Sequence, residues 1–261
     1  MDTLQRSKEQ IQKALEFLAK AKFTIAKNLQ DVVGRNRRGL PTQLVKKGLL
    51  VSRKMPTGQT IVGLSSKAAA MMGVKKIDIH KLSPLRVAHS LLVQTEIIAL
   101  MGYVVDYQFE PQANSHDYRP DAGLQITSGL IVDIEAEISP KGIKNGEMDR
   151  FFLKNLDTHT NKTQKRVVFK EESMLECYLT HAKRYYQDGI PRWIKVNGEW
   201  MKLDKVVRFS DKQWSRVMFK MSNDFAIHSL LYLIRNKVDI SACRLNSMPT
   251  DTMDLWLFDD E

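Results

Sequence analysis

The first third of the chain has the hydrophobic spacing of a small helical domain that ends in a hairpin. Between Leu4 and Ala21, apolar residues recur every three or four positions with lysine and glutamate opposite them, which predicts a helix. Gly34 and Gly48 each end a shorter helical segment, and two β-rich runs flank a turn-rich tip. The predicted elements are helices at 4–21, 24–33 and 36–47, strands at 49–53 and 60–64, and a short helix through Met72 that Ser65 caps.

The rest of the chain begins with one long helical segment and continues mainly as strands. Ser83 and Pro84 are residue types that begin a helix, and Gly102 is one that ends it. Asn197-Gly198 is a favoured two-residue hairpin turn. The predicted elements are a helix at 84–102, strands at 103–109, 118–126 and 130–138, a helix at 145–155, a strand at 166–170, a helix at 174–187 and a hairpin over 192–203.

The strand predicted over 130–138 carries three acids on one face. Asp133, Glu135 and Glu137 alternate with apolar residues, so the two sets point to opposite sides. A solvated outer face is the commonest explanation of such a pattern. Asp121 in the preceding strand and the later Lys141 favour a functional cluster instead, because buried carboxylates are usually paired with cations or bound to metal.

Length and composition indicate two modest domains, which we place at 1–83 and 84–261. The chain has 261 residues, of which 43% are hydrophobic, so it can bury one large core or two small ones. No apolar run is long enough to span a bilayer, and residues 1–10 lack a signal-peptide core, so we expect a soluble, cytoplasmic protein without membrane insertion. Cys177 and Cys243 are too few for a disulfide framework and are expected to fill space.

Positive charge is concentrated in the predicted first domain. Residues 1–83 contain 17 Lys or Arg against 5 Asp or Glu, which gives them a net charge of +12. The whole chain has a net charge of +10, so residues 84–261 have a net charge of −2. This asymmetry favours a nucleic-acid anchor at the amino-terminal end.

Three helices followed by a hairpin is the order of a winged helix-turn-helix domain, in which the third helix enters the DNA major groove and the wing contacts the backbone. A basic helical domain that binds protein is the alternative. The predicted DNA-binding residues are Arg35, Arg37, Arg38, Gln43, Lys46, Lys47 and Lys54.

The predicted order over about 84–205, helix, three strands, helix and strand, resembles the PD-(D/E)xK nuclease family. Pro120-Asp121 is similar to the first part of its motif and Glu135-Ala-Glu137 to the second, with Glu137 where the family most often has lysine. The resemblance implies an α/β (α+β) fold with a mixed central sheet. Lys141 is the candidate for the lysine by its position, and Lys144 and Lys154 on the following helix are the alternatives.

Hydrolysis of a phosphodiester requires a hard divalent cation that polarises the phosphate and activates water, and carboxylate oxygens bind such cations. We therefore expect Mg²⁺ or Mn²⁺ at Asp121, Glu135 and Glu137. Glu96 lies on the first helix of the resemblance, where the family often adds an acid, and His89 precedes it on the same stripe. His89 is equally expected as a helix-capping or core hydrogen-bonding residue.

A winged helix before this nuclease-like pattern resembles the replication-relaxation proteins and the MOBC-type plasmid mobilization relaxases. The resemblance implies a nickase that recognises double-stranded DNA at a plasmid transfer origin and cuts one strand to start conjugation. The six histidines include no His-hydrophobe-His triplet, and packing is the expected role of Tyr185-Tyr186. The acidic and apolar tail over 251–261 is expected either to dock a coupling or accessory mobilization protein or to pack on the body.

Two other functions fit the same pattern. The nuclease-like domain could be a scaffold without activity in a winged-helix DNA-binding regulator, because a fold does not fix a function. A restriction or repair nuclease would share the chemistry and differ in its substrate.

Overall fold

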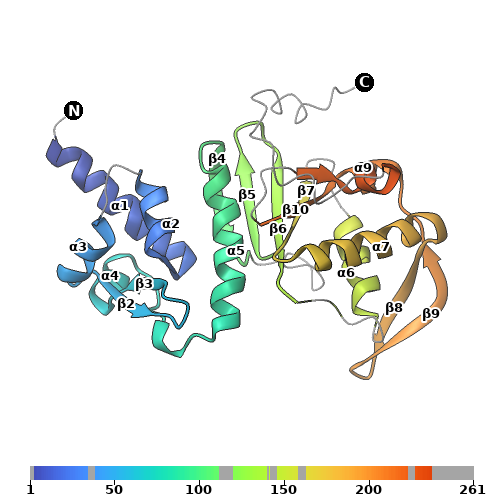
Figure 1. Ribbon diagram of the computed structural model, residues 1–261, viewed down its shortest axis with the longest axis horizontal. Coiled ribbons are helices and arrows are strands. Elements are labelled where there is room, and N and C mark those ends of the chain that lie inside the picture. Colours follow the sequence, from blue (N-terminus) through green and yellow to red (C-terminus); the bar gives the residue numbers. More distant parts are fainter. Residues whose placement is uncertain are drawn as a thin grey trace. The chain divides into compact units, whose positions relative to one another are not determined.

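The computed structural model (Figure 1) describes residues 3–34, 39–111, 120–139, 141, 146–157, 163–222 and 227–236. These residues form a mixed α/β structure with nine α-helices and a six-stranded mixed sheet. They divide into two compact units, one containing the described residues through 111 together with 120–134, and the other containing the described residues from 135 onward. Within the described ranges, no helix combines the length and the apolar character needed to cross a membrane.

The first unit begins with a helix, a strand, two helices and a hairpin, followed by a short helix. The three strands form an antiparallel sheet in the order β1–β3–β2. We predicted a helix from Thr24, but Phe23, Thr24 and Ile25 pair with β3, because aromatic and β-branched residues favour an extended, buried strand. The elements are α1 Thr3–Ala21, β1 Phe23–Ile25, α2 Ala26–Val33, α3 Leu40–Lys46, β2 Leu50–Lys54, β3 Thr60–Leu64, α4 Ser66–Met71 and the 3₁₀ turn η1 Ile79–Lys81.

The helix signals predicted at Ser65 and Ser83 are confirmed. The Ser65 hydroxyl accepts a hydrogen bond from the Ala68 backbone N–H, and Ser83 caps the next long helix in the same way. Pro41 lies in the first turn of α3, where a missing N–H is tolerated. The apolar faces of α1 to α4 enclose one core around buried leucines such as Leu18 and Leu44.

Three further elements belong to the first compact unit: α5 Pro84–Leu100, β4 Val104–Phe109 and β5 Ala122–Ile126. The Gln94 side chain on α5 donates a buried hydrogen bond to the Phe23 carbonyl over 2.7 Å. Lys20 on α1 forms an ion pair with Asp106 on β4, with 2.7 Å between Nζ and Oδ1. The unit therefore continues beyond Ser83, and the proposed domain boundary at 83/84 stays a prediction.

The large sheet has the strand order β11–β10–β7–β6–β5–β4. The predicted order of helix, three strands, helix and strand is confirmed as α5–β4–β5–β6–α6–β7. β10 is parallel to β7, whereas the pairs β4–β5, β5–β6 and β10–β11 are antiparallel, and neither β10 nor β11 was predicted. The further strands are β6 Ile131–Glu137, β7 Thr163–Phe169, β10 Val217–Met221 and β11 Ile227–Ser229.

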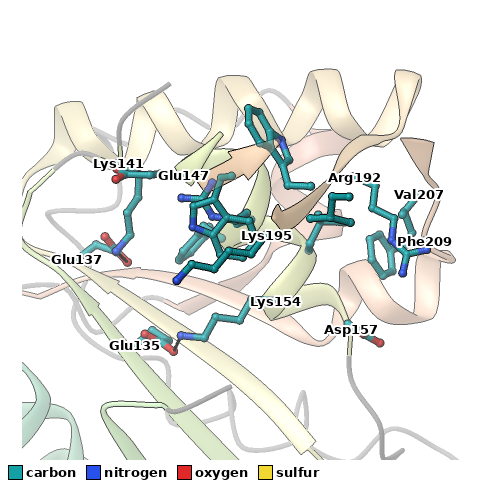
Figure 2. A pocket seen from close by; sticks show the side chains of 16 residues that line it. Glu135, Glu137, Lys141, Glu147, Lys154, Asp157, Arg192, Lys195, Val207 and Phe209 are labelled. Atoms are coloured by element: carbon teal, nitrogen blue, oxygen red, sulfur yellow. Dashed lines mark hydrogen bonds and ion pairs between the residues drawn. The ribbon is translucent and has the colours of Figure 1, made fainter. Parts of the chain in front are cut away.

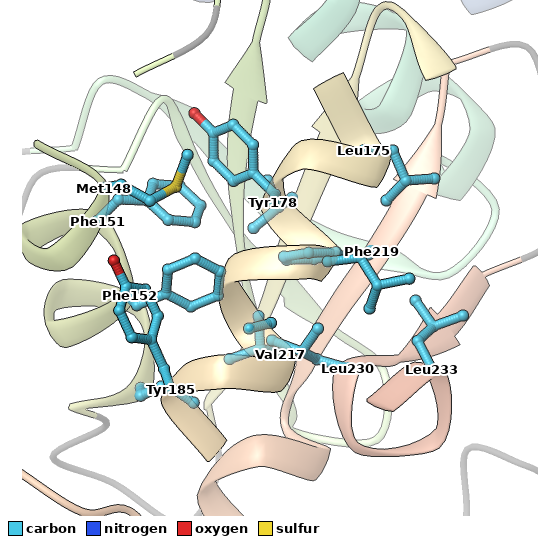
Figure 3. Close-up of a cluster of buried hydrophobic side chains, with 14 of the residues drawn as sticks. Met148, Phe151, Phe152, Leu175, Tyr178, Tyr185, Val217, Phe219, Leu230 and Leu233 are labelled. Carbon is cyan, nitrogen blue, oxygen red and sulfur yellow. The ribbon is translucent and has the colours of Figure 1, made fainter. Parts of the chain in front are cut away.

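The second unit is built around an aromatic core (Figure 3). The Phe151 and Tyr178 rings meet edge to face with centroids 4.9 Å apart, and Phe169 and Phe219 do the same at 4.9 Å. The helices that contribute are α6 Glu147–Leu156, α7 Glu172–Asp188, α8 Asp211–Ser215 and α9 Leu230–Arg235.

A separate two-stranded hairpin, β8 Ile190–Val196 and β9 Glu199–Val207, belongs to the same unit. Its turn at Asn197 and Gly198 has φ angles of 51° and 91°, as the predicted Asn-Gly hairpin requires. The observed strands extend the predicted hairpin by a few residues at both ends.

Candidate functional site

The acids of β6 are not on a solvated face. Glu135 is 8% exposed and Glu137 is 3% exposed, while Asp133 is only partly buried. The common explanation of the alternating pattern, a wet outer face, is therefore wrong for both glutamates. Because an isolated buried carboxylate is costly, each needs a compensating partner.

Glu135 has its partner on α6. Its Oε1 lies 2.7 Å from the Lys154 Nζ, and Figure 2 shows the lysine side chain reaching the carboxylate. The Lys154 side chain remains 30% exposed, so the pair combines a buried acid with a cation that solvent can reach. Of the three lysines considered for the nuclease-like motif, Lys154 is the one that contacts Glu135; Lys144 lies outside the described residues.

Each carboxylate oxygen of Glu137 is contacted by a side chain. The Tyr178 hydroxyl donates to Oε2 over 2.9 Å, and the Lys141 Nζ lies 3.3 Å from Oε1. Burial, followed by the negative charge of Glu137, raises the pKa of Tyr178 far above its ordinary value. The phenol therefore stays protonated and acts as a hydrogen-bond donor to the glutamate at neutral pH.

Both ion pairs border one hollow of about 1310 Å³ inside the second unit. The hollow is bounded by β6, α6 and the β8–β9 hairpin, and Figure 2 shows its lining side chains. Its walls mix charge with aromatic surface. The charged residues are Glu135, Glu137, Lys141, Glu147, Arg150, Lys154, Asp157, Arg192 and Lys195, and the aromatic ones are Phe151, Trp193, Trp200 and Phe209.

Asp121 lies in the first unit, directly before β5. Its backbone N–H donates to the Ile134 carbonyl over 3.0 Å, and its Oδ2 lies 3.2 Å from the His89 Nε2 on α5. The structure thus pairs His89 with a predicted site residue. Glu96, seven residues further along α5, is fully buried.

The predicted site residues therefore form three local groups: His89 with Asp121, Glu135 with Lys154, and Glu137 with Lys141. Among the described residues, no cluster of three or more His, Cys, Asp or Glu side chains has the arrangement of a metal site. The expected Mg²⁺ or Mn²⁺ ion stays a prediction. The donor chemistry suits such an ion, because Asp121, Glu135 and Glu137 offer the carboxylate oxygens that these cations prefer.

The predicted DNA-binding residues are described only in part. Gln43, Lys46, Lys47 and Lys54 are exposed, on or beside α3 and at the end of β2. Arg35, Arg37 and Arg38 lie outside the described residues, as do Cys243 and the tail over 251–261.

The packing role expected of the tyrosine pair on α7 is confirmed for Tyr185. Tyr185 is 3% exposed, and its hydroxyl donates to Asp149 on α6. Burial raises the pKa of Tyr185, which opposes formation of the phenolate that a tyrosine nucleophile needs. Tyr186 donates to Asp211 over 2.7 Å.

The sequence reasoning missed the residues that organise the walls of the hollow. Asp149 accepts hydrogen bonds from Tyr185 and from the Trp193 indole N–H, the latter over 2.8 Å. The Arg150 guanidinium lies over the Trp200 ring, 4.3 Å from its centroid. The two tryptophans on the predicted hairpin were the available signal, because large aromatic side chains on a short exposed hairpin need a partner.

Comparisons of this chain with protein-family models, curated proteins and solved structures find no match. The family resemblance of the sequence motifs therefore stays a prediction.

Proposed function

We propose that the protein is a metal-dependent DNA endonuclease that cuts one strand, and that it acts as a nickase at a plasmid transfer origin. The observation that carries the proposal is the ion pair at the hollow between the buried Glu135 and the partly exposed Lys154, with 2.7 Å between Oε1 and Nζ. Pairing an acid with an ammonium group beside an accessible hollow provides a ligand for a cation and a positive charge for a phosphate.

We propose that Lys154 is the residue that contacts the phosphate of the substrate. A lysine ammonium on a flexible stem stabilises negative charge that develops on phosphate oxygens. Its partial exposure allows it to contact a substrate, whereas Glu135 is nearly buried. Lys141, the candidate chosen by sequence position, contacts Glu137 and is assigned to holding that carboxylate.

The proposed metal ligands at the hollow are Glu135 and Glu137 of the second unit, and Asp121 of the first unit stays a prediction from the sequence motif. A bound Mg²⁺ or Mn²⁺ ion would polarise the phosphate and lower the pKa of a water molecule. His89 contacts the Asp121 carboxylate and would orient it. Tyr178 and Lys141 would hold the two oxygens of Glu137 in the same way.

We propose that the first part of the chain is a winged helix that supplies DNA binding. Its element order, helix, strand, two helices and two strands with β1 paired to β3, supports this assignment. Gln43 and Lys46 are exposed on α3, the helix expected to enter the groove, and Lys54 is exposed at the tip of the wing, where β2 ends.

The test is cleavage of supercoiled plasmid DNA, with and without a cognate transfer origin, in the presence of Mg²⁺ or Mn²⁺. Relaxed circles report nicking and linear molecules report double-strand cutting. We expect Glu135→Gln and Lys154→Met to abolish nicking while duplex binding is kept, and Glu176→Gln, which changes an exposed acid on α7, to nick normally. Normal nicking by Glu135→Gln would refute the assigned site.

Binding distinguishes the enzyme from a regulator that lacks activity. If the parent protein binds duplex DNA tightly and leaves every plasmid intact with either metal, the nuclease assignment is wrong and the DNA-binding role remains. Lys46→Ala should weaken binding to all duplexes and lower its salt dependence, while Gln43→Ala should change sequence preference.

A further inference from the structure

The β8–β9 hairpin is held at the hollow by specific contacts rather than by extension of the large sheet. Trp193 donates its indole N–H to Asp149, and Asp149 is also bonded to Tyr185 of the core. Gly146, at the start of α6, lies so close to the Trp193 ring that any Cβ there would overlap it. The hairpin is therefore anchored through the middle of β8 to α6, and Asp149 of α6 is held in turn by Tyr185 of α7.

One face of the hairpin combines aromatic and basic side chains. Trp193 pairs across the strands with Lys202, and Lys195 pairs with Trp200, so these four residues share a face. Arg150 of α6 lies over this face, 4.3 Å from the Trp200 ring centroid and 5.9 Å from that of Trp193. Trp200 is nevertheless 45% exposed, so part of its indole remains open to a ligand.

The charge of the hairpin favours an anionic ligand. Residues 190–208 contain five Lys or Arg against two acids, and all five cations are exposed. Arg192 and Lys195 also line the hollow; in Figure 2 Arg192 lies on the side opposite Glu135 and Glu137, and Lys195 lies between them. A ligand that stacks on Trp200 would therefore have cations for its phosphates beside it.

We propose that this hairpin face is a binding platform for unpaired DNA, with a base stacked on Trp200 and phosphates on Lys195 and Lys202. Base stacking on aromatic side chains together with backbone contacts to cations is the general way in which proteins bind single strands. A duplex cannot use Trp200 in this way, because its bases are already stacked on one another. The hollow, at about 1310 Å³, exceeds the about 300–1,000 Å³ of typical small-molecule sites, which favours a polymer segment.

This inference rests on the proposed function, because it assigns the substrate of the same hollow as a locally melted strand. The strand would pass from the hairpin toward Glu135 and Lys154, which line the hollow with it. The winged helix would bind the flanking duplex, and the hairpin would hold the strand to be cut.

The test measures binding of the full-length chain to a fluorescein-labelled oligothymidylate of about 15 nucleotides, by anisotropy, with EDTA present so that no cleavage occurs. We expect Trp200→Ala to weaken binding about 5- to 150-fold, which corresponds to the usual effect of removing one stacked base contact. Trp200→Phe should restore most of the affinity. Met201→Ala, which changes the neighbouring residue on the other face, 53% exposed against 45% for Trp200, should bind as the parent does.

Two further readouts separate the outcomes. Stacking should quench the tryptophan fluorescence of the parent protein, and Trp200→Phe should remove that quenching. Duplex affinity should be the same in Trp200→Ala and in the parent. Unchanged oligothymidylate affinity in Trp200→Ala, with an unaltered melting temperature, would refute the platform even if the parent nicks plasmids. Loss of affinity in a protein that cuts nothing would support the platform and refute the nuclease.

Discussion

Replacing Tyr178 by phenylalanine isolates the hydrogen bond that holds Glu137. The change removes one hydroxyl and keeps the ring, which packs against Phe151 and Phe169 with centroids 4.9 and 5.0 Å away. The acceptor is a carboxylate that is 3% exposed, so water cannot replace the lost donor at low cost. A hydrogen bond to a charged group contributes about 1.5–3 kcal/mol, and Lys141 still contacts the other oxygen. We therefore expect a loss of about 2 kcal/mol in the free energy of unfolding.

This loss corresponds to a melting temperature lower by about 4–8 °C, since 1 kcal/mol shifts a domain of 150–250 residues by about 2–4 °C. Urea unfolding at pH 7 followed by circular dichroism measures it, with Tyr232→Phe, at a 50% exposed position, as the matched control. The loss should shrink in a Glu137→Gln background, because the partner is then neutral. A Tyr178→Phe midpoint equal to that of the control, or an equal loss in both backgrounds, would refute the reasoning.

Three further predictions concern other contacts. Gly146→Ala should lower the melting temperature and change tryptophan emission, because a Cβ would overlap the Trp193 ring and the backbone has φ +65°. Burial raises the pKa of Tyr107 to about 12, so the folded state keeps the phenol proton above pH 10. The stability that this group contributes is present below pH 10 and is lost as the pH rises toward 12. Tyr107→Phe should reduce this loss, measured as the urea midpoint at each pH. Lys20→Met should lower the free energy of unfolding by less than about 1 kcal/mol in the same assay, because the ion pair between Lys20 and Asp106 is exposed. A larger loss would show that the contact of the Lys20 ammonium with the Tyr107 ring contributes more than the ion pair.

Local signals in the sequence predicted most elements of the first two thirds of the chain. Serine caps, glycine stops and the Asn-Gly turn act through the backbone of a few neighbouring residues, so they can be recognised without knowledge of the fold. The strand Phe23–Ile25 was missed because its pairing partner, β3, lies almost forty residues later. β10 was missed for the same reason, because its parallel partner β7 lies about fifty residues earlier. β11 pairs with the nearby β10 and was missed because a strand of 3 residues is too short to show an alternating pattern.

The sequence predicted which acids form the candidate site, but not which lysine contacts each of them. Alternation placed Glu135 and Glu137 on one face, and the structure shows that this face is buried. Sequence position suggested Lys141 as the substitute for the motif lysine, and its contact with Glu137 is seen only in the structure. The contact between Glu135 and Lys154 joins a strand to a helix nineteen residues on, and only the packing of α6 determines it.

The energetic cost of these pairs supports a functional reading over a structural one. The other face of β6 shows what stability alone favours, since Val132, Ile134 and Ala136 are buried there as an ordinary apolar core. Burying charged groups requires desolvation that an ion pair often repays only in part, and apolar side chains of similar size would commonly be as stable. Placing Glu135 and Glu137 opposite that core therefore gains little stability. What the arrangement does provide is a pair of fixed carboxylates, each contacted by a lysine, at the wall of a hollow that a phosphate-bearing ligand could enter.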